Sequence, residues 1–162
     1  MPLSDDAPLA VALGANQPSA VGEARQTLLA VRPLLEAQLT AWAAQPLQFH
    51  WSALLETDPV GPVDQPRYLN GVLLVKTLAL EPSEAAALQL LDRLHGLERR
   101  FGRDRTQEQR WGPRPLDLDL LFWGELRLDL PQLVLPHPRL HLRAFVLEPL
   151  LQAMQASHPP CW

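Results

Sequence analysis

The chain has 162 residues, of which 47% are hydrophobic, and its 14 Lys and Arg against 18 Asp and Glu give a formal net charge of −4. This length suits one globular domain, and the negative charge disfavours binding to nucleic acid or to an anionic membrane. The single cysteine, Cys161, excludes an internal disulfide framework, no apolar run is long enough to span a membrane, and the acidic first residues do not resemble an export signal. We therefore expect a cytoplasmic, monomeric protein with one domain over 1–162, including an N-terminal extension at 1–7 and a tail at 151–162.

The first half of the chain is predicted to contain three strands and one helix. Residues 8–13, PLAVAL, form a strand-like run, and the turn after it offers Ser19 as a helix cap. Apolar residues then recur at helical spacing, and we expect Pro33 to kink or break this helix. Residues 47–55 and 69–80 are predicted as two further strands separated by a proline-rich loop.

The second half contains the clearest helix, predicted over 81–102 with Ser83 as its N-cap and Gly102 at its end. A strand follows at 115–123, and we expect a turn after it to lead into a short strand partner at 126–128. The order β-α-β-β-α-β is that of the ferredoxin-like α+β fold, an antiparallel sheet with two helices on one face. To this fold the sequence adds an extra hairpin and a C-terminal helical segment.

Two aspartates, Asp117 and Asp119, interrupt an apolar run in the strand predicted at 115–123. Side chains alternate along a strand, so both carboxylates share one face while the leucines between and beside them point to the other. Such a pair is commonly only a solvated sheet face, but it can also bind Mg²⁺, which completes its shell with water and phosphate oxygens. Nearby arginines favour a polyphosphate ligand, because guanidinium groups and cations together neutralise phosphoryl oxygens. The candidate cations are Arg103, Arg105, Arg110, Arg114 and Arg143, with His137 as a further donor.

These residues alone are also compatible with other functions. A ferredoxin-like module could sense a nucleotide or another small anion without chemistry, although it would have little use for the aspartate pair. A palm-type nucleotidyl transferase also carries paired aspartates on a sheet. An RNA-binding ferredoxin-like domain is disfavoured by the net charge and by the lack of an aromatic RNP pattern.

Five blocks of the sequence together resemble the 6-hydroxymethyl-7,8-dihydropterin pyrophosphokinases of folate biosynthesis. In chain order they are VALGAN (11–16), TDPVGPVDQPRYLN (57–70), LERRFGRDR (97–105), RWGPRPLDLDLLFWG (110–124) and LPHPRLHLRAFVLEPL (135–150). The resemblance implies transfer of the β,γ-pyrophosphoryl unit of ATP to the hydroxymethyl oxygen of the reduced pterin, with release of AMP. No residue stands out as a general base, so we expect catalysis mainly by positioning and electrostatics.

The resemblance also implies roles for particular residues through their places in these motifs. It assigns catalysis to Arg103, Arg105, Arg114, Asp117 and Asp119, and two Mg²⁺ ions to Asp117 and Asp119. It assigns pterin binding to Thr57, Asp58, Val60, Tyr68, Asn70, Trp111 and Phe145, with the amide of Asn70 facing the heterocycle. It assigns ATP binding to Glu98, Arg103, Arg105, Trp111, Arg114, Leu120, His137 and Arg143, where Leu120 contributes its backbone.

Three positions depart from the family pattern, and one segment is expected to move. Ala15 stands where a serine is common, Pro138 follows the histidine where some members have tyrosine, and His95 lies where members can offer an amide to the nucleotide. These departures concern contacts to ATP and leave the metal and pterin sets unchanged. The stretch 102–113 combines glycine, charge and few apolar anchors, so we expect a mobile lid that closes over the phosphates.

Overall fold

A computed structural model gives the fold and describes residues 6–59, 64–108, 113–138 and 162. The C-terminal helical segment expected from the sequence lies outside the described residues. Neither of the two helices has the length and apolarity of a membrane-spanning segment.

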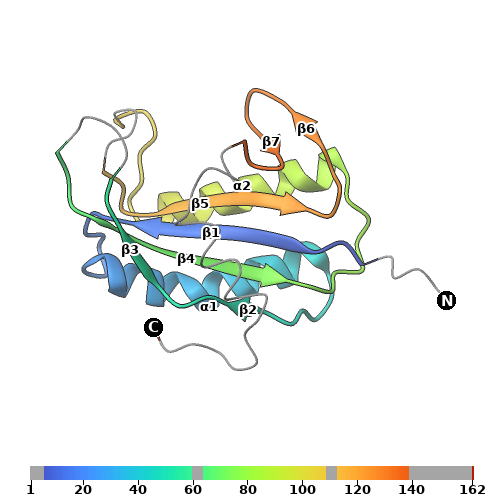
Figure 1. The fold of residues 1–162 in the computed structure, drawn as a ribbon, viewed down its shortest axis with the longest axis horizontal. Coiled ribbons are helices and arrows are strands. Elements are labelled where there is room, and N and C mark those ends of the chain that lie inside the picture. Colours follow the sequence, from blue (N-terminus) through green and yellow to red (C-terminus); the bar gives the residue numbers. More distant parts are fainter. Residues whose placement is uncertain (1–5, 60–63, 109–112, 139–161) are drawn as a thin grey trace.

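The centre of the molecule is an antiparallel sheet whose strands follow the order β2-β4-β1-β5, with β3 also paired to β4 (Figure 1). This order confirms the ferredoxin-like topology, because β1 and β4 lie side by side in the middle of the sheet, as the first and third strands of the β-α-β-β-α-β pattern do. The strands are β1 (Leu9–Ala15), β2 (His50–Trp51), β3 (Leu55–Thr57), β4 (Tyr68–Val75) and β5 (Asp117–Trp123). The single strand predicted over 47–55 is thus two short strands that border β4.

Helices α1 (Ala24–Ala43) and α2 (Glu84–Arg100) cover one face of the sheet (Figure 1). The start of α2 is as predicted, since the Ser83 hydroxyl accepts a hydrogen bond from the Ala86 backbone N–H at 3.2 Å. Its end is also as predicted: the chain leaves the helix through Gly102, whose φ of +93° lies in the region that favours glycine.

The prediction for the start of α1 was wrong, and the helix does not break at Pro33. Its N-cap is Glu23, while Ser19 forms a tight turn with Gly22 and bonds through its hydroxyl to the Thr27 hydroxyl at 2.7 Å. The helix also continues through Pro33. A proline inside a helix costs about 3 kcal/mol, but burial of the helix's apolar face against the sheet offsets this cost. The buried apolar residues of that face are Leu28, Val31, Leu35, Leu39 and Ala43.

The strand partner predicted at 126–128 was also wrong in its pairing. Strand β6 (Leu128–Asp129) pairs with β7 (Val134–Leu135) in a separate two-stranded hairpin, and not with β5. At the outer edge of β5, the His137 backbone N–H donates to the Leu121 carbonyl at 2.7 Å. The chain that returns from the hairpin therefore contacts the edge that the sequence assigned to the short strand.

The two faces of the sheet differ in character. The helix-covered face carries the main core, whereas the open face holds a small apolar cluster of Ala10, Val72, Leu74 and Leu121. Farther along β1, the open face turns polar, because Gly14 lies opposite Asn70 on one side and Asp117 on the other. This end of the open face is where the predicted site residues gather.

Candidate active site

The two aspartates lie on the open face of the sheet, as their alternation predicted. Asp117 lies opposite Gly14 of β1 and Asp119 opposite Ala12, while Leu118 between them is buried in the core under the helices. Leu116 and Leu120 are buried in the same core. The leucines fix the strand, and the carboxylates face the side of the sheet that the helices leave uncovered.

Arg103 occupies the centre of a buried ion cluster. Its side chain is only 2% exposed. Nη1 donates to Glu98, to Asp117 at 2.8 Å and to the Leu116 carbonyl at 3.2 Å. The opposite edge, formed by Nε and Nη2, binds both oxygens of Glu108 at 2.6 and 3.1 Å. Charge-assisted bonds of this kind are the strongest hydrogen bonds between side chains. Through them Arg103 connects helix α2, the loop after it and strand β5.

Glu98 is the second member of this cluster and is 1% exposed. Besides Arg103, it accepts from Arg105 at 2.8 Å and from the Leu118 backbone N–H at 2.9 Å. Burial raises the pKa of Glu98 above its ordinary value, and the charge of Arg103 only partly opposes this effect. The bond to Leu118 attaches the last turn of α2 to β5 between the two aspartates.

Arg114 contacts the cluster more loosely. Its guanidinium lies 3.4 Å from Asp117 and 3.7 Å from Glu108, and its buried Nε has no hydrogen-bond partner among the described residues. The backbone of Arg114 is instead held firmly by Asn16, whose side-chain oxygen accepts its N–H at 2.9 Å and whose own N–H donates back at 3.1 Å. The backbone of Arg114 is therefore fixed, whereas Nε of its guanidinium lacks a hydrogen-bond partner among the described residues.

The two aspartates differ in their protonation behaviour. Burial alone would raise the pKa of Asp117, but the charges of Arg103 and Arg114 outweigh it and hold the pKa below its usual value. Burial and the neighbouring charges of Asp117 and Glu98 raise the pKa of Asp119 to about 7. No described donor hydrogen-bonds to the Asp119 carboxylate, so its charge is the least compensated in the cluster.

A divalent cation would fit this pair of carboxylates. Within residues 6–59, 64–108 and 113–138, no group of three or more His, Cys, Asp or Glu could hold a metal ion. Mg²⁺ does not require such a group, because it usually binds one or two carboxylates and completes its shell with water and substrate phosphates. The carboxylate of Asp119, which has no hydrogen-bond partner among the described residues, and that of Asp117 would supply the hard oxygen donors that Mg²⁺ prefers.

Three of the residues predicted for pterin binding, Thr57, Tyr68 and Asn70, lie on β3 and β4 at the same end of the sheet as Asp117. The amide nitrogen of Asn70 donates to the Thr57 hydroxyl at 2.7 Å and lies 3.4 Å from the Leu55 carbonyl, so its donors are directed into the protein. Tyr68 is half-buried near the same end of the sheet, and burial raises its pKa above the ordinary value, which the charge of Arg114 only partly opposes. Asp58 instead points to solvent and pairs with Arg67 at 3.0 Å.

Several predicted residues lie outside the described part of the chain: Val60, Arg110, Trp111, Arg143 and Phe145. Part of the predicted lid, 109–112, lies there too, and its motion stays a prediction. Within the described part, Leu120 keeps its side chain in the core, and His137 contacts the edge of β5 through its backbone.

Sequence reasoning missed two residues that build the site. Asn16 ties the end of β1 to Arg114 and, through its amide nitrogen, to Gln65 at 2.8 Å and the Pro66 carbonyl at 2.9 Å. The only signal for Asn16 was its place in the VALGAN block. Glu108 pairs with Arg103 and Arg114, and no sequence motif marked it. Asn16 contacts a residue 98 positions away in the chain, and Glu108 lies in an irregular loop. Hydrophobic periodicity predicts neither kind of contact.

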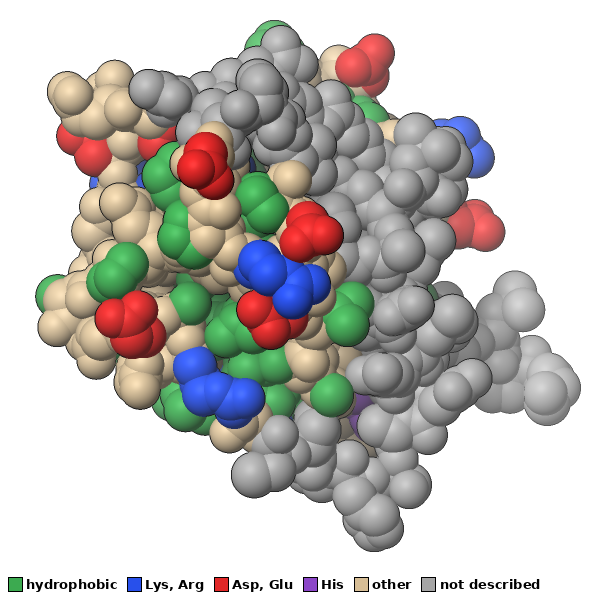
Figure 2. Space-filling view, turned by 60° about the vertical axis from the view of Figure 1, so that its left-hand side comes forward, with side chains coloured by type: hydrophobic (Ala, Val, Ile, Leu, Met, Phe, Trp, Pro, Cys, Tyr) green, Lys and Arg blue, Asp and Glu red, His purple; other side chains and the backbone are tan. Residues whose placement is uncertain are grey.

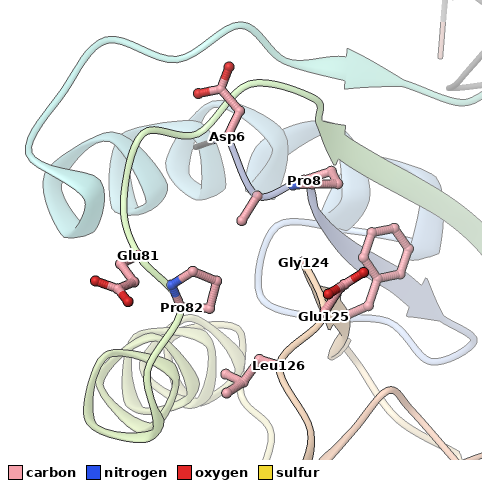
Figure 3. A pocket seen from close by; sticks show the side chains of 9 residues that line it. Asp6, Pro8, Glu81, Pro82, Gly124, Glu125 and Leu126 are labelled. Atoms are coloured by element: carbon pink, nitrogen blue, oxygen red, sulfur yellow. The ribbon is translucent and has the colours of Figure 1, made fainter. Parts of the chain in front are cut away.

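The surface at this end of the molecule carries charges of both signs close together (Figure 2). A hollow of about 680 Å³ lies at the opposite end of the sheet, between the start of β1, the segment before α2 and the turn after β5 (Figure 3). Its charged lining residues are Asp6, Glu81 and Glu125, and none of the described residues that line it is an arginine or a lysine. Because a polyphosphate needs cations, the ion cluster is the better candidate for the active site.

Comparison with known proteins shows which family this chain belongs to. The family model of 7,8-dihydro-6-hydroxymethylpterin-pyrophosphokinase matches residues 10–155. A 2-amino-4-hydroxy-6-hydroxymethyldihydropteridine pyrophosphokinase of Pseudomonas aeruginosa is 44% identical over 140 residues, covering 86% of this chain and 76% of that protein. A relative of the same name from Haemophilus influenzae is 34% identical over 142 residues, covering 88% and 78%.

Two further matches are partial. The Bacillus subtilis protein of the same name is 43% identical over 104 residues, covering 64% of this chain and 58% of that protein. A solved HPPK-DHPS structure from Plasmodium falciparum has a TM-score of 0.47 and 13% identity, covering 91% of this chain and 40% of that one. The fold and the carboxylate pair define a ferredoxin-like domain built around an acidic and basic cluster. The chain belongs to the 7,8-dihydro-6-hydroxymethylpterin-pyrophosphokinase family.

The two arginines that contact Glu98 should differ sharply in their effect on folding. Arg103→Met leaves Glu98 buried without its main countercharge, so we expect a loss of about 3–5 kcal/mol in the free energy of unfolding. Arg105 is 49% exposed. Arg105→Met should therefore cost less than about 1 kcal/mol. Urea denaturation measures both, and equal losses for the two variants would contradict a structural role specific to Arg103.

His95 should make stability fall in mild acid. Burial, followed by the charges of Arg105 and Arg103, lowers the pKa of His95 below its ordinary value of 6.5. As pH falls below about 6.5, the unfolded chain therefore binds a proton that the folded chain resists, and the folded state loses stability. His95→Gln removes this loss, so the unfolding free energy of the variant relative to wild type should be higher at pH 5 than at pH 7.5. Parallel pH profiles would refute the shift.

Proposed function

We propose that the protein transfers the β,γ-pyrophosphoryl unit of ATP to the hydroxymethyl oxygen of 6-hydroxymethyl-7,8-dihydropterin, giving AMP and the pterin pyrophosphate. The observation that carries this proposal is the pair Asp117 and Asp119 on one sheet face, bordered by Arg103, Arg105 and Arg114. Membership of the pyrophosphokinase family supports it. The same proposal places the enzyme in folate synthesis.

ATP would be held by the charged side of the cluster. Arg105 is half-exposed and Arg114 is partly exposed, so both guanidinium groups could meet a phosphate. The buried Nε of Arg114, which has no hydrogen-bond partner among the described residues, would gain one from a phosphate oxygen. Glu98 would not contact ATP itself but would hold Arg103 and Arg105 in place through its ion pairs. This assignment refines the sequence-based one, in which Glu98 contacts ATP directly.

The two aspartates would bind the metal ions. We propose that Asp117 and Asp119 hold two Mg²⁺ ions, which supply charge neutralisation of the triphosphate and polarisation of the transferred phosphorus. Asp119 has the free carboxylate for this role, and Asp117 is kept ionised by Arg103 and Arg114. The contribution of the chain itself is positioning, because strand β5 places both aspartates and the ion pairs with Arg103 and Arg114 hold the Asp117 carboxylate before substrate arrives.

The pterin would bind next to the cluster, toward β3 and β4. Thr57 and Asn70 form a polar pair there, and the Asn70 oxygen, which lies close to Gly14 and accepts no hydrogen bond from the described residues, would accept from the heterocycle. Tyr68 borders this region, and we propose Phe145 and Trp111 as the stacking rings. Leu120, His137 and Arg143 would complete the adenosine and phosphate contacts.

We infer that residues 1–162 act as one cytoplasmic, monomeric domain, with small molecules as substrates. The family match over residues 10–155 supports a single pyrophosphokinase unit. A nucleotide-sensing module of the same fold is the competing function. It would bind ATP with Mg²⁺ but form no AMP when the reduced pterin is added.

Removal of the free carboxylate tests the proposed function. Asp119→Asn should lower the rate of AMP formation by roughly a thousandfold, because a metal ligand is lost. The variant should stay folded, since no described donor depends on Asp119. Asp129→Asn, an equal charge change on the exposed end of β6, is the matched control and should keep wild-type activity. Activity of Asp119→Asn within tenfold of wild type would contradict the metal assignment.

A further inference from the structure

The carboxylate of Glu108 binds Arg103 in the geometry that a phosphate would adopt. Its two oxygens accept from Nε and Nη2 of Arg103 at 2.6 and 3.1 Å. This parallel, two-point arrangement is the one that guanidinium groups also form with phosphate oxygens. One oxygen of Glu108 lies 3.7 Å from Nε of Arg114 as well. Glu108 thus places negative charge between two arginines that the proposed function assigns to phosphates.

Of the three carboxylates around Arg103, Glu108 is the one that can leave. Glu98 is fixed on α2 and Asp117 on β5, and both bind the Nη1 edge of the guanidinium. Glu108 lies in the irregular segment after α2, binds the opposite edge by itself, and is 16% exposed. Withdrawal of Glu108 frees one whole edge of Arg103 without breaking the contacts that hold it in the core.

Arg114 shows that Glu108 only partly satisfies the cluster. At 3.7 Å the contact is an ion pair but too long for a hydrogen bond, and the buried Nε of Arg114 has no hydrogen-bond partner among the described residues. An unsatisfied buried donor is costly, and an anion seated between Arg103 and Arg114 would remove that cost. A tetrahedral phosphate offers more acceptor oxygens at this point than a carboxylate does.

The balance of charge leads to the same conclusion. Three guanidinium groups, those of Arg103, Arg105 and Arg114, lie among four carboxylates, those of Glu98, Glu108, Asp117 and Asp119. A cluster with surplus negative charge repels a polyphosphate. Departure of Glu108 would remove one of these negative charges, and among the four carboxylates Glu108 is the one not anchored on a helix or strand.

We propose that Glu108 is an internal competitor for the phosphate site: its carboxylate occupies the Nε and Nη2 edge of Arg103 in the ligand-free protein, and a phosphate oxygen of ATP takes its place. This inference rests on the proposed function, since it concerns the same ligand. Glu108 is a positioning residue that keeps Arg103 neutralised and oriented before ATP binds. Its return to Arg103 would also favour release of the phosphorylated products.

Titration calorimetry with two probes tests the inference. The probes are the Mg²⁺ complex of α,β-methylene-ATP, which cannot be cleaved at the reacting bond, and inorganic tripolyphosphate without metal. Wild type is compared with Glu108→Gln and with Asp104→Asn. Asp104 is an exposed carboxylate in the same segment that bonds only to Thr106 among the described residues, so its replacement changes the net charge equally without touching the arginines.

We expect Glu108→Gln to bind both probes roughly three- to tenfold more tightly than wild type, because the competing charge is gone. Asp104→Asn should stay within about twofold of wild type. Equal affinities for the two variants, or weaker binding by Glu108→Gln, would overturn the inference. If wild type binds neither probe and forms no AMP, the proposed function fails and the inference falls with it.

A second measurement does not depend on the variant. The ¹⁵N–H signal of Arg103 Nε reports its hydrogen-bond partner in wild-type protein. Saturation with tripolyphosphate should shift this signal as the Glu108 carboxylate is replaced, whereas the shift should be absent on adding adenosine alone. An unchanged Arg103 signal in tripolyphosphate-saturated protein would overturn the exchange even if Glu108→Gln failed to fold.

Discussion

The buried ion pair between Arg103 and Glu98 is the interaction on which the site depends. Charges so fully removed from water persist only when they are paired and hydrogen-bonded, and here each group meets several partners. Because those partners include Asp117 and the Leu118 backbone, the pair fixes the start of β5 against the end of α2. The position of the two aspartates on the open face is therefore set by electrostatics as well as by the pairing of β5 with β1.

Local signals in the sequence were sufficient for most of the fold. Alternation predicted the face of Asp117 and Asp119, and a capping serine predicted the start of α2 at Ser83. Predictions failed where distant parts of the chain decide. Helix α1 tolerates Pro33 because its apolar face is buried, and the segment after β5 pairs with β7 because the edge of β5 is contacted by the returning chain at His137.

The site was predicted less completely than the fold. Its residue types followed from the motifs, but the sequence did not show that Arg103 and Glu98 are buried partners, or that Asn16 holds the backbone of Arg114. These contacts depend on which side chains the fold brings together, and no local sequence pattern shows that. The sequence also did not show the bulge in β5. This bulge lies opposite Ala10 and Val11 and shifts the pairing of β5 with β1, so that the open face carries both Asp119 and Phe122, three positions apart. Strict alternation would have separated them.

The most direct test is a crystal structure with Mg²⁺, α,β-methylene-ATP and the reduced pterin bound together. The account predicts metal ions coordinated by Asp117 and Asp119, with the triphosphate beside Arg105 and Arg114 and the Arg103–Glu98 pair still intact. Phosphates bound away from this cluster, with both aspartates free of metal, would contradict it.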